Sequence, residues 1–307
     1  MILAQSRTNN DLTRRCALEL GAFMKEKWTK LLLDLIRRAS TTISDDVSAA
    51  LERARGADAG HPRAAPTLDM LLRDCSLARE GGVPLCQDTG TLTFFFDVPR
   101  GCDEYALREA ASAAVAEATR KGWLRRNTID SLTGKSIDTN VAPGAPVCHF
   151  EQRSDADPRI TASLIMKGGG SENMSRQFSL PDSSIGAGRD LEGVRKCILQ
   201  AVWLAQGKGC APGVLGVCIG GDRSEGWLHA KRQLLRDLGD HSPEPALAAL
   251  EDRVLSEANS LGIGPMGTGG KTTLLGVKIA ARTRLPASFF VTVAYNCWAC
   301  RRATVTA

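Results

Sequence analysis

The sequence predicts a mixed α/β protein in which helices alternate with short strands. Stretches with apolar residues three and four apart are separated by short apolar runs, and these runs are bounded by Gly, Pro or Asn. Such alternation is typical of chains that pack helices against sheets. The 307 residues, of which 43% are hydrophobic and 24% charged, are enough for one large domain or two lobes with a substantial core.

Several of the expected helices have an apolar period or a recognisable cap. The stretch 44–55 begins with the capping sequence SDD, and 104–121 follows Asp103, a favoured capping residue. In 189–206, apolar residues recur at spacings of three and four. The expected helices are 16–38, 44–55, 67–80, 104–121, 189–206, 225–237 and 245–260.

Short apolar runs are expected to form the strands, at 92–98, 160–166, 214–219 and 287–295. The polar stretch WLRRNTIDSLTGKSIDTN has neither a helix nor a strand period and is expected to be a loop. Residues 1–15 are expected to form a flexible arm. Residues 16–307 are expected to form one domain, in which a division into two lobes stays open.

Composition excludes several classes of protein. The net charge is +5, but Lys and Arg are interspersed with acids and aromatic residues make up only 5%, so we expect no nucleic-acid binding. No apolar window is long enough to span a bilayer, and the N-terminus lacks the organisation of a secretory signal. We therefore expect a cytoplasmic protein whose ten cysteines are mostly reduced, for which catalysis or metal binding outranks disulfides.

Three cysteines share a context that the others lack. Cys86, Cys210 and Cys297 each lie at the end of a regular element, beside Pro, Gly or Asn. Local zinc modules pair their ligands within a few residues, which these cysteines do not, whereas a fold can bring distant loops together around an iron–sulfur cluster. Spacing alone leaves open whether they meet at a cluster or are three unrelated thiols.

Six motifs carry a resemblance to a known family. In order, they are PLCQDTGT, LRRNTIDSLTG, KGGGSENMS, GCAPGVLGV, GIGPMGTGGKTT and YNCWACRR. This series resembles that of the class I fumarate hydratase and tartrate dehydratase family, over roughly residues 65–302. The resemblance implies a [4Fe–4S] cluster held by Cys86, Cys210 and Cys297. Three thiolates leave one iron with an open position, which makes it a Lewis acid.

The resemblance also implies roles for residues beside the first cysteine. Gln87 would bind a substrate carboxylate, and Asp88 would handle a proton or position the substrate hydroxyl. The structural alternative for Asp88 is an Asx-turn carboxylate that binds its own backbone. In LRRN, Arg125 aligns with the substrate arginine of the family, and Arg126 is expected to be solvated.

Two glycine-rich segments are expected near the substrate. The backbone N–H groups of Gly169 and Gly170 could cradle an anion, and the alternative is a tight turn that needs positive φ. In GIGPMGTGGKTT, Lys271 is the candidate substrate contact. This segment is not a phosphate loop, because Pro265 stands where that pattern needs glycine.

Two further features qualify the resemblance. Cys300 forms a C-x-x-C pair with Cys297, but the thioredoxin-like context is absent, so it is expected to be a bystander. The family commonly has a histidine before the segment leading to the last cysteine, and this chain has Leu285 there.

The sequence therefore predicts the α subunit of an iron–sulfur hydro-lyase that interconverts fumarate and L-malate. The chain ends soon after the last expected ligand, so we expect a separate β subunit to supply the rest of the site for a C4-dicarboxylate, in an α2β2 assembly. The alternatives are an L(+)-tartrate dehydratase α subunit, a non-catalytic iron–sulfur protein and, more weakly, a zinc-stabilised binding module.

Overall fold

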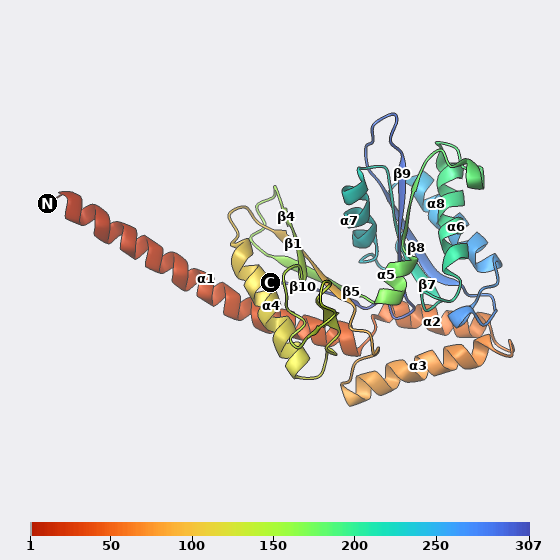
Figure 1. The fold of residues 1–307 in the computed structure, drawn as a ribbon, viewed down its shortest axis with the longest axis horizontal. Helices are drawn as coiled ribbons and strands as arrows, with labels where there is room; N and C mark the ends of the chain where they lie inside the picture. The colour runs from red at the N-terminus through yellow and green to blue at the C-terminus, as the bar shows by residue number, and fades with distance from the viewer. Residues whose placement is uncertain (1) are drawn as a thin grey trace.

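The computed structural model describes the backbone of residues 2–307 and the side chains from residue 21 onward, residue 22 excepted. Two four-stranded sheets carry helices on their faces (Figure 1), which confirms the predicted mixed α/β class. The strand orders are β10–β5–β1–β4 and β6–β9–β7–β8. The strands are β1 Thr91–Val98, β4 Val147–Gln152, β5 Thr161–Lys167, β6 Arg176–Ser179, β7 Gly213–Ile219, β8 Leu274–Ala281, β9 Phe290–Asn296 and β10 Arg302–Thr306.

Helices cover the faces of both sheets. Helices α1 and α4 pack on the first sheet, α6 and α8 cover one face of the second sheet, and α7 covers its other face. The α-helices are α1 Ile2–Thr41, α2 Asp45–Ala57, α3 Ala64–Gly81, α4 Glu104–Arg120, α5 Gly169–Met174, α6 Leu191–Ala205, α7 Arg223–Gln233 and α8 Pro245–Ser260. Short 3-10 turns lie at Ser183–Ile185 and Pro265–Gly267.

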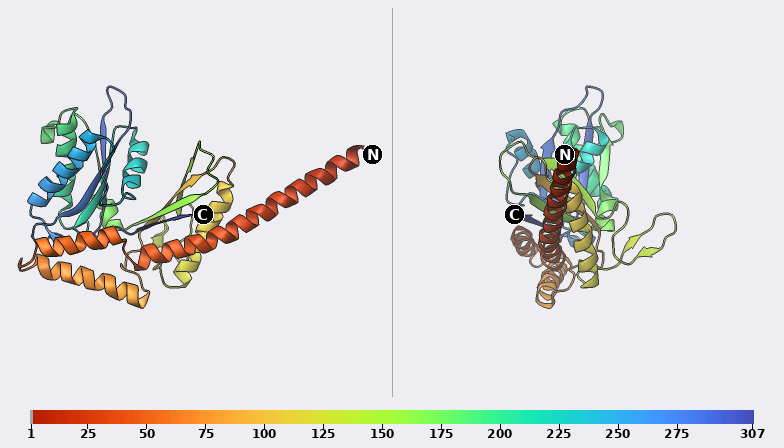
Figure 2. Two further views of the ribbon diagram at one scale, coloured as in Figure 1. Left: turned by 180° about the vertical axis from the view of Figure 1, so that it is seen from behind. Right: turned by 90° about the vertical axis from the view of Figure 1, so that its left-hand side faces the viewer.

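Helix α1 is longer than the sequence predicts, because its backbone runs without interruption from Ile2 to Thr41. Its C-terminal half packs against α4 and the first sheet through Trp28, Leu32 and Ile36. The N-terminal half extends away from both sheets (Figure 2). The side chains of residues 1–15 lie outside the described residues, so the predicted flexible arm stays a prediction.

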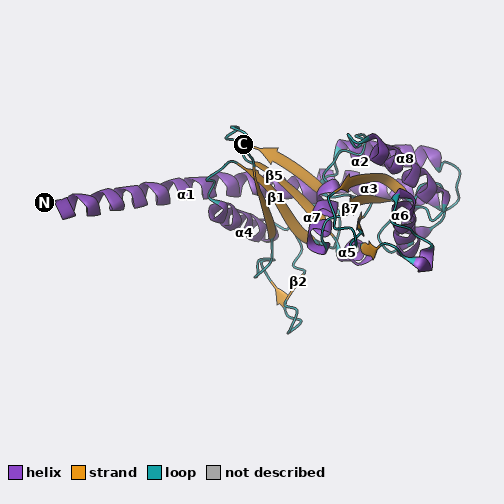
Figure 3. Ribbon diagram, turned by 90° about the horizontal axis from the view of Figure 1, so that it is seen from above, coloured by secondary structure: helices purple, strands orange, loops and turns teal. Residues whose placement is uncertain are grey.

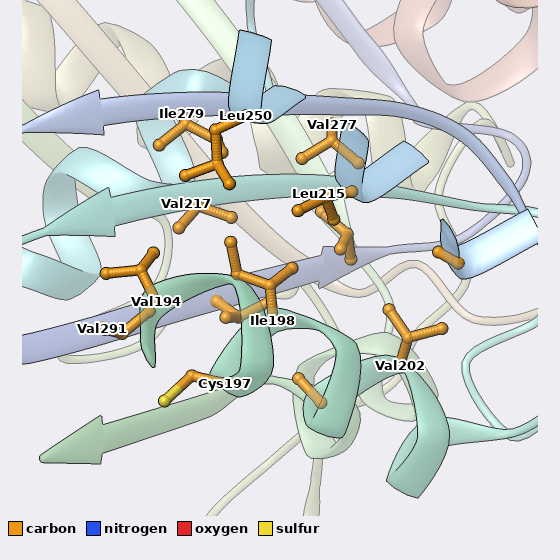
Figure 4. Packing of buried hydrophobic residues seen from close by; sticks show 14 of the residues in the cluster. Val194, Cys197, Ile198, Val202, Leu215, Val217, Leu250, Val277, Ile279 and Val291 are labelled. Atoms are coloured by element: carbon orange, nitrogen blue, oxygen red, sulfur yellow. The ribbon is translucent and has the colours of Figure 1, made fainter. Parts of the chain in front are cut away.

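The core follows from the alternation of side chains along buried strands. In β7, Leu215, Val217 and Ile219 face α6 and α8, whereas Val214 and Cys218 face α7. The apolar stripe of α6 packs on the first of these faces (Figure 4), as its helical period predicts. Burying both faces explains why β7 is a continuous apolar run.

Some elements were not expected from the sequence. These are β4, β6, β8, β10, the short helix α5 and a two-stranded hairpin in the predicted loop. The hairpin, formed by β2 (Thr128–Ile129) and β3 (Ser136–Ile137), projects from the body of the molecule (Figure 3). Among the described residues, no helix combines the length and the apolar character needed to cross a membrane.

The ends of several strands meet at the junction of the two sheets. In the first sheet, β5 is antiparallel to both β1 and β10, so the end of β5 lies beside the starts of its two neighbours. In the second sheet, the antiparallel pair β7 and β9 brings the start of β7 beside the end of β9. The chain crosses between the sheets at 168–175 and 297–301. The segments that carry the predicted site residues all lie at this junction.

Candidate active site

The turn CQDTG enters β1 and is held by the carboxylate of Asp88. Oδ1 of Asp88 accepts hydrogen bonds from the amide of Gly90 (2.9 Å) and from Nδ2 of Asn127 (2.9 Å), and Oδ2 accepts one from the amide of Gly169 (2.6 Å). The bond to Gly90 is the Asx-turn of the structural alternative. The other two bonds join this carboxylate to two more of the predicted motifs, LRRN and KGGG.

Gly90 is required at the end of this turn. Its φ is +73°, and a Cβ there would lie 2.5 Å from the backbone carbonyl of Lys167. Only glycine permits both the left-handed backbone and this approach. The turn can therefore pack directly against the end of β5, where the KGGG segment begins.

The loop that carries Arg125 is anchored through its backbone. The hydroxyl of the buried Thr89 accepts a hydrogen bond from the Arg125 amide (2.9 Å) and donates one to its carbonyl (2.8 Å). The side chain of Arg125 is exposed, and so is that of Gln87. Among the described residues, neither side chain forms a hydrogen bond or ion pair, so both are available to a ligand.

Asn140 is a second anchor of this loop, and sequence reasoning missed it. Its side chain is 1% exposed and its φ is +57°, a conformation that asparagine tolerates better than most residues. Oδ1 accepts the amides of Asn127 (3.1 Å) and Thr128 (3.0 Å), while Nδ2 donates to the Arg125 carbonyl (2.8 Å) and to the hydroxyl of Thr119 (3.1 Å). An asparagine in a polar, turn-rich stretch was the only available signal.

The KGGG segment differs from the turn that its three glycines predict. Gly168 is the N-cap of α5, and none of Gly168, Gly169 and Gly170 has positive φ, so the tight-turn alternative is wrong. A Cβ on Gly168 would lie 2.8 Å from Oδ2 of Asp88, which explains the glycine by close approach. The amide of Gly169 is occupied by the Asp88 carboxylate rather than free for a substrate.

The three predicted cysteines lie close together at the junction. The amide of Trp298 donates to the carbonyl of Cys210 (3.1 Å), which joins the segments that contain Cys210 and Cys297. Burial raises the pKa of the Cys210 thiol, and the nearby negative charges of Cys297, Cys86 and Asp88 raise it further. Cys86 and Cys297 are half-buried, and Cys210 is exposed.

Tyr295 supports this group of thiols from behind. A Cβ on Gly209 or Gly213 would lie within 2.4 Å of the Tyr295 ring, so glycines let the ring pack under the Cys210 turn. Burial raises the pKa of Tyr295, and Cys297 and Cys210 add to that effect. Its buried hydroxyl has no hydrogen-bond partner among the described residues.

A buried ion pair lies beside the same junction. The ammonium of Lys167, 2% exposed, is 2.6 Å from Glu172, and Glu172 also binds Lys231 at 2.8 Å. Burial lowers the pKa of Lys167 to about 8, against the opposing effect of Glu172. Glu172 therefore holds the start of α5 against β5 and α7, a structural role.

A cleft of about 630 Å³ opens next to this constellation. Its walls are the CQDTG turn, the hairpin and the loop before β4, with Asp88, Asn127 and Gly169 on its lining. The size of this cleft is suitable for a small polar ligand. Asp88 is thus the one predicted catalytic residue that both contacts the cleft and lies beside an expected cluster ligand.

Comparison with known proteins identifies the family. Residues 29–306 match the family described as Fumarate hydratase (Fumerase). The chain belongs to this family. Some of its relatives are named as fumarate hydratases and others as subunits of tartrate dehydratases.

One relative, named "Putative fumarate hydratase class I", from Geobacillus stearothermophilus, is 47% identical over 90% of this chain and 54% of its own length. Another, named "Putative L(+)-tartrate dehydratase subunit alpha", from Methanocaldococcus jannaschii, is 34% identical over 90% of this chain and 96% of its own length. The L(+)-tartrate dehydratase subunit alpha of Escherichia coli K12 is 29% identical over 91% of this chain and 90% of its own length. The chain therefore spans about half of the first relative and most of the other two.

Two residues that the family resemblance singled out, Leu285 and Lys271, lie at opposite ends of the second sheet. Leu285 is 72% exposed in the loop between β8 and β9, at the opposite end of the second sheet from Cys297. The seven residues of β9 separate them by about 20 Å. Lys271 lies at the same end of the sheet as Cys210, held by a hydrogen bond of 2.6 Å from its amide to Asp58. The Lys271 side chain is exposed, and it forms no hydrogen bond with any of the described residues.

The remaining cysteines behave as expected for small apolar residues. Cys300 is 1% exposed and points into the interior, where Arg302 donates to its sulfur (2.9 Å). Cys75 and Cys197 are buried on the apolar faces of α3 and α6. All cysteines with described side chains are free thiols.

Proposed function

We propose that this chain is the cluster-binding, α-type part of a hydro-lyase that interconverts fumarate and L-malate. The observation that carries the proposal is the meeting of Cys86, Cys210 and Cys297 at one junction, next to Asp88 and the anchored Arg125 loop. These residues lie in the motifs that resemble the class I family, and the family match supports the same reaction type. Because the chain spans about half of one relative, the activity of a complete enzyme remains a proposal.

We propose a [4Fe–4S] cluster as the cofactor, and the donor set fits such a group. Three thiols converge from three turns, and the buried hydroxyl of Tyr295 beside them has no partner. Among the described residues, no three His, Cys, Asp or Glu side chains are close enough to hold a single metal ion. The three cysteines of the proposed cluster need not share one metal ion, because each would bind a different iron. When bound, such a cluster would supply a Lewis acid for the substrate hydroxyl.

The residues of the chain would bind and orient the dicarboxylate. The guanidinium of Arg125 presents two parallel N–H donors that match a carboxylate, and its backbone is fixed by Thr89 and Asn140. The side-chain amide of Gln87 is also exposed and would be a second group for a carboxylate. Asp88 faces the cleft and would hold or move the proton of the substrate, while the amides of Gly90 and Gly169 keep its carboxylate in place.

Gly169, Gly170 and Lys271 are weaker parts of the proposal. The amide of Gly169 serves Asp88, so its contribution to substrate binding would be indirect. Gly170 and Lys271 are exposed near the junction, where a substrate or a partner chain could reach them. The position of Leu285, about 20 Å along β9 from Cys297, removes the concern that a missing histidine there leaves a gap beside the thiols of this chain.

We further propose that a separate β-type chain completes the site. The proposal is supported by the relatives named subunit alpha, whose lengths this chain almost matches. An α2β2 assembly stays a prediction. A cytoplasmic location likewise stays a prediction.

The names of two relatives favour one second candidate, an L(+)-tartrate dehydratase of the same chemistry. L-malate and L(+)-tartrate differ by one hydroxyl, so a direct comparison of the two reactions decides between the candidates. The test is to reconstitute the purified chain with iron and sulfide under anaerobic conditions, add the candidate β chain, and follow malate from fumarate and oxaloacetate from tartrate. Malate formation supports the proposal, and oxaloacetate formation alone supports the second candidate. A cluster whose spectrum responds to no dicarboxylate would instead support a non-catalytic iron–sulfur protein.

A further inference from the structure

Arg301 has a buried charge that the described chain leaves without a partner. The residue is 2% exposed and is among the largest fully buried side chains. Its Nε has no hydrogen-bond partner, and no described residue forms an ion pair or a side-chain hydrogen bond with its guanidinium. The side chain of the adjacent Arg302, 7% exposed, instead pairs with Asp46 and Cys300.

The Arg301 side chain lies behind the candidate active site. It belongs to the segment 297–301 that crosses between the sheets, four residues after Cys297. Its Nη2 lies 3.8 Å, and Oδ2 of Asp88 lies 2.8 Å, from the position that a Cβ on Gly168 would occupy. Two charged side chains from distant segments thus approach the same glycine. Asp88 and Arg301 form no direct ion pair, and the Asp88 carboxylate accepts hydrogen bonds from three other groups, all of them uncharged.

A guanidinium in this position lacks a direct ion-pair partner among the described residues. Arginine cannot shed its proton in a protein, so burial cannot be relieved by neutralisation. An isolated buried charge is strongly unfavourable, whereas a paired one is tolerated. The sulfurs of Cys86 and Cys297 belong to the same junction, and a cluster that they hold would bring further negative charge to it.

We propose that Arg301 is the buried cationic partner of the iron–sulfur centre. This inference rests on the proposed function. Its role is electrostatic: it stabilises the negative charge that the thiolates bring to the junction. A cation there favours the more reduced, more negative state of the cluster, because net charge and hydrogen bonding set the potential of such centres. It also makes cluster loading contribute more to the stability of the fold.

The proposal predicts opposite effects of one substitution on two forms of the protein. Arg301→Met keeps a similar length and removes the charge. In the cluster-free chain it should leave the thermal midpoint unchanged or raise it, since an unpaired buried charge is lost. In the loaded chain it should lower the midpoint, so the stabilisation gained on loading shrinks. Arg301→Lys, which keeps the charge, should retain most of that gain.

The experiment combines these midpoints with redox titration of the reconstituted chain, followed by electron paramagnetic resonance. Arg301→Met should reduce the equilibrium constant for one-electron reduction at least tenfold, which is about 59 mV. Arg126→Met is the control, because Arg126 is exposed and pairs with Asp138 at 3.4 Å. It should change neither the potential nor the gain on loading.

Each outcome decides the inference. An Arg301→Met protein with the wild-type potential and the wild-type gain on loading overturns it. A wild-type potential combined with weakened dicarboxylate binding overturns it in favour of a substrate contact. If Arg301→Met does not fold without the cluster, the reduction potential of the Arg301→Lys protein still decides. This variant keeps the charge, so a tenfold change in its equilibrium constant for one-electron reduction would contradict a charge-based role. Failure of the wild-type chain to take up iron defeats the proposed function itself, and this inference with it.

Discussion

Asn140 provides a direct test of how the Arg125 loop is held. Three of its hydrogen bonds hold the segment 125–128: two amides donate to Oδ1, and Nδ2 donates to the Arg125 carbonyl. Each such bond contributes about 1 kcal/mol net, so together they contribute about 3 kcal/mol to keeping the loop closed. Since about 1.4 kcal/mol corresponds to a factor of ten, their loss should raise the open population about 100-fold.

The variant for this test is Asn140→Gly, because glycine accepts the φ of +57° and removes only the side chain. Native-state hydrogen exchange of the Asn127 and Thr128 amides should accelerate about 100-fold, while the amides of β7 keep their protection. Asn140→Asp keeps an acceptor for both amides but cannot donate to the Arg125 carbonyl, so its exchange should be intermediate.

The same variants connect the loop to binding. Because Arg125 is anchored through its backbone, loosening the loop should weaken dicarboxylate binding to the reconstituted protein without changing its iron content. Exchange at Asn127 and Thr128 that stays within threefold of wild type in Asn140→Gly would refute the reasoning, since these bonds would then not hold the loop.

Three further predictions concern the junction and its surroundings. Glu172→Gln leaves the ammonium of Lys167 buried with a neutral partner. Because Glu172 is itself 39% exposed, the cost should be about 1.5–3 kcal/mol, seen as a lower urea midpoint; an unchanged midpoint would show that the Lys167–Glu172 pair does not stabilise the fold. Burial alone would raise the pKa of Asp46, but the hydrogen bond from the Leu238 amide and the charge of Arg302 hold it below its usual value. Its stabilisation is therefore complete above pH about 4 and is lost as the pH falls through the lowered pKa; Asp46→Asn should flatten this acid limb in a pH series of melts, and an identical limb would contradict the assignment. Gly90→Ala places a Cβ 2.5 Å from the backbone carbonyl of Lys167 at a φ of +73°, so it should lower the thermal midpoint by several degrees and reduce cluster uptake, whereas normal uptake would argue against tight packing of the CQDTG turn.

The parts of the fold that could be predicted are those with strong local signals. Helix α8 was predicted with its observed bounds, and α4 begins at the residue after its predicted cap, whose Oδ1 accepts the Ala106 amide at 3.0 Å. Strand β7 was predicted within one residue because a fully buried strand is a continuous apolar run. In these elements the local pattern and the tertiary environment agree.

The elements that sequence reasoning missed depend on distant partners. Strand β8 contains Lys278, which breaks its apolar run in sequence, yet the ammonium is buried and donates to the carbonyls of Leu238 and Asp240. Strand β10 is short and exposed on part of its length, and it exists because β5 pairs with it. Neither pairing is visible in a local window of residues.

The candidate site shows the same division. The motifs pointed to Cys86, Cys210 and Cys297, but only strand pairing explains why three turns so far apart in the chain meet. The glycines of KGGG were expected to cradle an anion or, as the alternative, to form a tight turn; in the structure, Gly168 permits close approach of Asp88. The sequence did not single out Arg301 beside the cysteines, because burial and the lack of an ion-pair partner are properties of the folded chain.

Iron and sulfide content after anaerobic reconstitution tests the central claim most directly. The account predicts about four irons and four sulfides per chain, the count of one [4Fe–4S] cluster. It predicts loss of this content when Cys86, Cys210 or Cys297 is individually changed to Ser, and retention in Cys300→Ser. Iron uptake that is absent from the wild-type chain, or that survives all three substitutions, would contradict it.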